Sequence, residues 1–193
     1  MPTLRDTARA TLVVLTGWLL SWVLASPAAA RDKTVLGLEL GAQFRVPACE
    51  PGDGTFPSRN CYRGAPVHHR AWGANEYQVT LPGAGTPPYV RGDIKVFVIA
   101  GLVESVQIST WGIEAQPGVM SSLTQKYGEP TRATQQKVKG MRSRCPTQYV
   151  EWEFGDFSVK YDGTTGSIDW GRIVVSTQRY RKLLDAQEKR PPG

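Results

Sequence analysis

Residues 94–111 read Ile-Lys-Val-Phe-Val-Ile-Ala-Gly-Leu-Val-Glu-Ser-Val-Gln-Ile-Ser-Thr-Trp, and this stretch decides the fold. Residues 94–100 are almost continuously β-branched or aromatic, which is typical of a strand buried on both faces. Residues 103–111 alternate, with Val106 and Ile108 on one side and polar residues on the other, which predicts a half-buried strand. Because a glycine-containing turn separates the two runs, we predict an antiparallel hairpin.

A short helix is predicted directly after this hairpin, over residues 117–127. Pro117 suits a first helical turn because the N–H that it lacks has no partner there, and Gly128 and Pro130 end the helix. The apolar residues recur at spacings of three and four and form one stripe: Val119, Met120, Leu123 and Tyr127. A helix this short is unstable alone in water, so we expect the stripe to pack on the sheet.

The rest of the chain adds strands and a second helix. We predict strands over residues 34–40, 131–138, 148–154, 157–161 and 168–176, with Gly171 as a bulge, and a helix over residues 177–188. Helices do not alternate with strands, which excludes a doubly wound parallel sheet. The predicted fold class is α+β, with an antiparallel sheet of about five to seven strands, one short central helix packed on one face and a C-terminal helix.

Residues 47–88 are rich in Pro, Gly, Arg and Asn, and we predict a long loop region that carries function. Cys49 and Cys61 flank a part of it that cannot build a core of its own. A disulfide between them would restrict this segment in the unfolded state, so we predict the pair Cys49–Cys61 and an unpaired thiol at Cys145. Pairing of Cys145 with either of the other two stays open, since spacing alone does not decide connectivity.

Residues 1–30 have the pattern of a signal peptide. Arg5 and Arg9 precede an apolar run over residues 12–25, and Ala28 and Ala30 form a small-residue cleavage site. We expect cleavage near Ala30 and a destination in the periplasm or the medium, with membrane contact only before cleavage; a retained anchor is the alternative. The expected organisation is a single α+β domain over residues 31–188, followed by a basic tail over residues 189–193.

The formal net charge of +6 is too small to indicate a nucleic-acid partner, and we expect none. Two groups of residues are candidates for binding. Trp72 and Trp111 lie near predicted loops, where tryptophan often anchors a partner. A basic loop could bind a polyanion such as lipid or polysaccharide, through Lys137, Lys139, Arg142 and Arg144.

No catalytic, metal-binding or cofactor motif is present in the sequence. His68 and His69 are adjacent, so on a strand they point to opposite faces and do not share a metal. Glu50 and Asp53 are not part of a calcium-loop pattern. Glu151 and Glu153 alternate onto one strand face, and a carboxylate pair of this kind could hydrolyse a glycan, although a solvated face neutralised by Arg132 or Lys160 is the commoner arrangement.

Two segments carry a resemblance: Ile-Ala-Gly-Leu-Val-Glu-Ser-Val at residues 99–106 and Leu-Thr-Gln-Lys-Tyr-Gly-Glu-Pro-Thr at residues 123–131. This pattern resembles small exported proteobacterial periplasmic proteins, mostly uncharacterised. It is distantly similar to the α+β modules of envelope-assembly lipoproteins and of secreted β-lactamase-inhibitor proteins. The resemblance covers roughly the second half of the chain after residue 30, and it carries over no site residue. We therefore predict a non-enzymatic periplasmic binding module for a protein or envelope component, with a cell-wall glycan hydrolase or a polyanion binder as alternatives.

Overall fold

The hairpin at the centre of the chain forms as its sequence predicts. The computed structural model describes residues 32–137 and 146–189. Within it, β5 (Ile94–Ile99) and β6 (Leu102–Trp111) pair antiparallel. Ala100 and Gly101 make the turn with φ of 52° and 82°, the left-handed conformation that a tight two-residue hairpin turn needs. Val106 and Ile108 are buried on one face of β6, which confirms the alternation.

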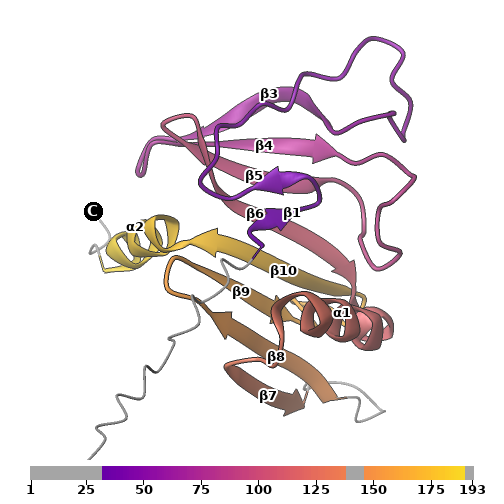
Figure 1. Ribbon diagram of the computed structural model, residues 1–193, viewed down its shortest axis with the longest axis vertical. Coiled ribbons are helices and arrows are strands. Elements are labelled where there is room, and N and C mark those ends of the chain that lie inside the picture. Colours follow the sequence, from indigo (N-terminus) through magenta and orange to yellow (C-terminus); the bar gives the residue numbers. More distant parts are fainter. Residues whose placement is uncertain (1–31, 138–145, 190–193) are drawn as a thin grey trace, which may run out of the picture. The chain divides into compact units, whose positions relative to one another are not determined.

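An antiparallel sheet of eight strands, in the order β3-β4-β5-β6-β10-β9-β8-β7, forms the body of the described structure (Figure 1). β10 returns to lie beside β6, so two four-stranded meanders join along this pair. The predicted α+β class is confirmed, but the predicted number of strands is too low. The remaining strands are β3 (Cys61–His69), β4 (Ala74–Thr80), β7 (Arg132–Lys137), β8 (Pro146–Glu153), β9 (Phe157–Asp162) and β10 (Trp170–Thr177).

The missing strands lie in residues 47–88, where the prediction of a continuous loop region is wrong. β3 is an edge strand, and most of its residues are exposed whether they are polar or apolar, so it shows no apolar alternation. A register shift between Arg63 and Val67 further interrupts its pattern. β4 owes its order to pairing with β5, whose apolar residues cover Val79. Tertiary pairing therefore imposed strands that the local sequence does not show.

Residues 34–40 form a miniature hairpin instead of the predicted single strand. β1 (Thr34–Val35) and β2 (Leu38–Glu39) pair with each other and join no other strand. Leu36 and Gly37 turn the chain with φ of 49° and 81°. The turn places Val35, Leu38 and Leu40 in the main apolar core.

α1 (Gly112–Tyr127) begins five residues earlier than predicted, because its first turn is held from outside. The N–H of Ile113 donates to the carbonyl oxygen of Ile168 at 2.9 Å. This contact supports the turn before Pro117, although proline removes one helical hydrogen bond there. The predicted apolar stripe is confirmed at its buried members, Val119, Leu123 and Tyr127.

α1 and the β1–β2 hairpin cover the same face of the sheet, and together they enclose the larger apolar core. That core contains Trp152, whose Nε1 donates to the carbonyl oxygen of Gly128 at 2.8 Å and so caps the end of α1. Burial of the phenol is also the main reason why the pKa of Tyr127 is raised. The C-terminal end of α1 is thus fixed to the sheet.

α2 (Gln178–Glu188) confirms the predicted C-terminal helix and lies on the opposite face. Thr177 caps it, its Oγ1 accepting from the N–H of Tyr180 at 3.2 Å. Tyr180 packs against Phe97 and Ile99, which alternate away from the larger core. Gly171 is not the predicted bulge: it stays in register opposite Thr110, and a Cβ there would lie 2.5 Å from Thr110 Oγ1. Close packing, and not a break in the strand, requires glycine at this position.

Candidate functional site

The predicted disulfide between Cys49 and Cys61 is confirmed, with the two Cα atoms 4.8 Å apart. The loop that it closes is also braced from inside, because Asp53 Oδ2 accepts from the N–H of Glu50 at 2.7 Å. Asp53 lies near both sulfurs, but sulfurs joined in a disulfide are not the thiolates that bind metal. Phe56 projects from this loop with 74% of its surface exposed.

Two tryptophans meet at the end of the sheet near this loop. Trp111 ends β6 and pairs in register with Trp170, the first residue of β10. The guanidinium carbon of Arg91 lies 3.5 Å from the ring centroid of Trp170 and 4.2 Å from that of Trp111. Arg91 therefore stacks over both rings, an arrangement in which a cation is attracted to the face of each indole.

The backbone fixes Arg91 in this place. Its N–H donates to the carbonyl oxygen of Ser109 at 2.8 Å, and its Nη1 donates to the carbonyl oxygen of Asp169 at 2.9 Å. Arg91 makes no ion pair with any residue in the described ranges. A guanidinium has five N–H donors in one plane, so most of these donors remain for a ligand.

The loop before β10 completes the site. The carbonyl oxygen of Ile168 accepts from the start of α1, and the backbone there passes so close to Gly112 that a Cβ would lie 1.8 Å from that oxygen. This close approach brings the exposed side chain of Ile168 beside the two tryptophans, where all three line a hollow of about 310 Å³. Glu114 and Asp169 add carboxylates to its wall.

A second hollow, of about 380 Å³, also has Trp111 in its wall. Phe56, Pro87 and Pro88 line it, with Asp93 as a charged group. We call the surface made by Phe56, Trp111, Ile168 and Trp170 the Trp111 patch. These are four of the five large hydrophobic residues that are exposed in the described part of the chain. An exposed apolar cluster of this kind marks interaction sites more often than scattered single residues do.

The two predicted tryptophans separate in the structure. Trp111 lies in the patch, whereas Trp72 packs in the smaller core, with its ring 5.6 Å from that of Phe97 and 5.3 Å from that of Tyr180. Packing therefore accounts for Trp72. The predicted basic residues Lys139, Arg142 and Arg144, and the thiol of Cys145, lie outside the described residues, as does the side chain of Lys137 at the end of β7.

Glu151 and Glu153 are engaged in ion pairs. Lys160 Nζ lies 2.7 Å from Glu151, and Arg181 Nη1 lies 2.6 Å from both oxygens of Glu153. Burial by itself would raise the pKa of Glu151, but the hydrogen bond and charge of Lys160, helped by the charge of Arg132, outweigh it, and its pKa is lowered. A general acid in glycan hydrolysis needs a raised pKa, so this environment does not favour that role.

The adjacent histidines have separate partners. His68 Nδ1 lies 2.9 Å from Asn75 Oδ1, and His69 Nε2 lies 3.0 Å from Glu76 Oε2. Lys95 also pairs with Glu76, at 2.7 Å. The two imidazoles are thus used in cross-strand contacts, and they do not converge.

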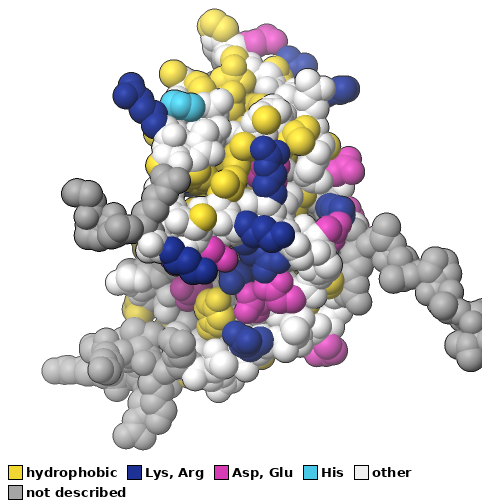
Figure 2. Space-filling model, turned by 90° about the vertical axis from the view of Figure 1, so that its left-hand side faces the viewer, with side chains coloured by type: hydrophobic (Ala, Val, Ile, Leu, Met, Phe, Trp, Pro, Cys, Tyr) yellow, Lys and Arg dark blue, Asp and Glu magenta, His cyan; other side chains and the backbone are white. Residues whose placement is uncertain are grey.

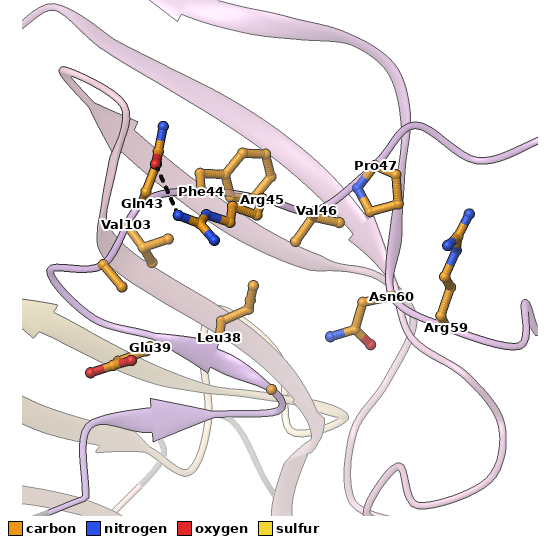
Figure 3. A pocket seen from close by; sticks show the side chains of 12 residues that line it. Leu38, Glu39, Gln43, Phe44, Arg45, Val46, Pro47, Arg59, Asn60 and Val103 are labelled. Atoms are coloured by element: carbon orange, nitrogen blue, oxygen red, sulfur yellow. Dashed lines mark hydrogen bonds between the residues drawn. The ribbon is translucent and has the colours of Figure 1, made fainter.

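Two larger hollows lie away from the Trp111 patch. A hollow of about 580 Å³ lies between β2 and residues 42–47, where Arg45 bonds only weakly to Gln43, at 3.4 Å (Figure 3). A hollow of about 800 Å³ lies under α2, but two of its basic residues, Lys160 and Arg181, are already paired with acids. On the face seen in Figure 2, basic side chains lie among acidic ones and do not form a separate patch.

Sequence reasoning identified Trp111 but missed Phe56, Arg91, Ile168 and Trp170. A signal for Trp170 was present: it alternates out of phase with the core residues Ile173 and Val175, so it had to leave the apolar face. Arg91 had no signal of its own, since its role depends on two rings that come from other strands.

Comparisons with protein-family profiles, with curated proteins and with solved structures find no match for this chain. The resemblance drawn from residues 99–106 and 123–131 therefore stays a prediction. Neither α1 nor α2, the helices of the described ranges, has the length and apolar character that crossing a bilayer requires.

Proposed function

We propose that this protein is a non-enzymatic binding module of an exported, oxidising compartment, and that it captures a protein or envelope component at the Trp111 patch. The observation that carries the proposal is the gathering of four exposed large apolar side chains along two hollows that share Trp111, with Arg91 stacked over the two tryptophans. Trp and Arg are the residues most enriched where binding energy concentrates. The disulfide is compatible with export, and residues 1–30 supply the predicted signal peptide.

The alternatives have less support. The glycan-hydrolase reading needs Glu151 or Glu153 to act as an acid, and both carboxylates are held by basic partners. The polyanion reading relies on a basic loop that lies outside the described residues, and several described basic side chains are already in ion pairs.

Site-specific photocrosslinking in cells that express the chain tests the proposal. A photoreactive residue replaces Ile168 inside the patch, and a matched variant carries it at Val67, which is also an exposed aliphatic residue but lies on β3. We expect a discrete adduct from position 168 only, lost when Trp111 and Trp170 are both changed to Ala. Equal adducts from both positions, or none from position 168, would count against the Trp111 patch as the binding site.

A further inference from the structure

We propose that the ligand of the Trp111 patch is a β-1,4-linked glycan, bound with one sugar ring in each of the two hollows that Trp111 lines. This inference rests on the proposed function and narrows its partner class. Trp111 lines both the 310 Å³ and the 380 Å³ hollow. Two adjoining hollows that share one aromatic wall suit a chain of small units, because each lies near the lower limit for a small-molecule site.

The aromatic surfaces match the apolar side of a pyranose. Trp111 and Trp170 keep 47% and 41% of their surfaces exposed although Arg91 covers one face of each ring. A β-1,4-linked chain of glucose or N-acetylglucosamine is flat, and its rings present C–H groups on both broad faces. Indole offers a large rigid apolar area with a polar edge, so stacking buries that area without stranding the hydroxyl groups at the rim of the sugar.

The polar groups of the hollows suit hydroxyls better than a charged ligand. Arg91 supplies N–H donors, while Glu114 and Asp169 in one hollow and Asp93 in the other supply acceptors. Acids therefore outnumber bases, which disfavours an anionic ligand such as phosphate or a polyuronate. Vicinal hydroxyls both donate and accept, so they can satisfy the arginine and the carboxylates together.

The site is also held in place before any ligand arrives. Arg91 is fixed by Ser109 and Asp169, and the disulfide closes the loop that carries Phe56. The ring of Phe56 rests against Gly83, where a Cβ would lie 3.3 Å from it. Surfaces already ordered in the free protein lose less conformational freedom on binding, which benefits a weakly interacting neutral ligand most.

Titration of the purified protein with soluble sugars tests the inference, with tryptophan emission and calorimetry as readouts. The probes are N-acetylchitotetraose, cellotetraose and their monosaccharides. We expect saturable binding of at least one tetrasaccharide, tighter than its monosaccharide by about 10-fold. Trp170→Ala should weaken it by at least about 10-fold, or 1.4 kcal/mol, whereas Trp111→Tyr, which retains an aromatic face, should stay within about 3-fold of wild type. Val67→Ala is the control and should bind as wild type.

The two experiments separate the two proposals. Failure of both tetrasaccharides to bind at millimolar concentration, or unchanged binding by Trp170→Ala, overturns the glycan inference. If a protein adduct nevertheless forms at position 168, the binding-module proposal stands with a protein as the partner. If neither sugar binding nor a specific adduct is found, both proposals fall.

Discussion

Replacing Gly112 by alanine tests how the Trp111 patch is built. Gly112 begins α1, and the chain before β10 crosses directly over it. A Cβ at this position would lie 1.8 Å from the carbonyl oxygen of Ile168 and 2.7 Å from the carbonyl carbon of Asp169. Both are backbone atoms, so no side-chain rotation relieves the clash, and the segment that carries Ile168 has to move away.

The cost follows from two losses and one gain. Overpacking costs about 1–3 kcal/mol, and losing the hydrogen bond from Ile113 N–H to Ile168 removes about 1 kcal/mol more. Alanine is favoured over glycine in a helix by up to about 1 kcal/mol. The net expectation is a free energy of unfolding lowered by about 2 kcal/mol, or a Tm lowered by about 4–8 °C for a chain of this size.

Thermal and urea unfolding, followed by circular dichroism, measure this difference. Gly118→Ala is the matched control, because Gly118 lies in the same helix, is exposed, and has no atom within 4 Å of the added Cβ. We expect Gly118→Ala to raise the stability by about 0.5–1 kcal/mol. If Gly112→Ala is as stable as wild type, the close approach at Ile168 is not a constraint, and the account of how the patch is held together is wrong.

Three further changes have definite expected outcomes. Glu151→Gln should lower the free energy of unfolding by about 2 kcal/mol at neutral pH, because it removes the charge-assisted hydrogen bond to Lys160. The folded-state pKa of Glu151 is lowered, so its contribution to stability is complete above the unfolded-state pKa and is lost as pH falls. The difference from wild type, measured by urea unfolding across pH, should therefore shrink below about pH 4. Persistence of the full difference under acid would contradict this. Replacing both Cys49 and Cys61 by alanine should lower the free energy of unfolding by about 3 kcal/mol. If the Tm of the wild-type protein is the same with and without a reducing agent, this expectation is refuted. Trp152→Phe removes buried volume and the hydrogen bond from the indole to the carbonyl oxygen of Gly128, so urea unfolding should show a free energy of unfolding lowered by about 1–3 kcal/mol. An unchanged urea midpoint would show that this hydrogen bond at the end of α1 is dispensable.

Local patterns predicted the elements whose burial is asymmetric. β6, β8 and β9 each have one apolar and one polar face, and α2 has a capping threonine at its start. The disulfide was also predictable, because Cys49 and Cys61 enclose a segment without core residues. In each case a few neighbouring residues contain the physical cause.

Elements that are stabilised by contacts with distant parts of the chain were not predicted from the sequence. β4 is a strand because it pairs with β5, and β3 is a strand because it pairs with β4. The start of α1 is helical because the carbonyl oxygen of Ile168 accepts from the N–H of Ile113. The candidate site escaped for the same reason: Phe56, Arg91 and Trp170 come from the disulfide loop, from the segment before β5 and from the start of β10.

The amino-acid sequence alone determined the central hairpin and the apolar stripe of the helix that follows, since both depend on periodicity over short distances. Tertiary structure alone decided that β10 returns beside β6 and so sets Trp170 opposite Trp111, with Arg91 stacked over both rings. Register between strands far apart in the chain is a property of the whole sheet, because each strand's alignment depends on its neighbours.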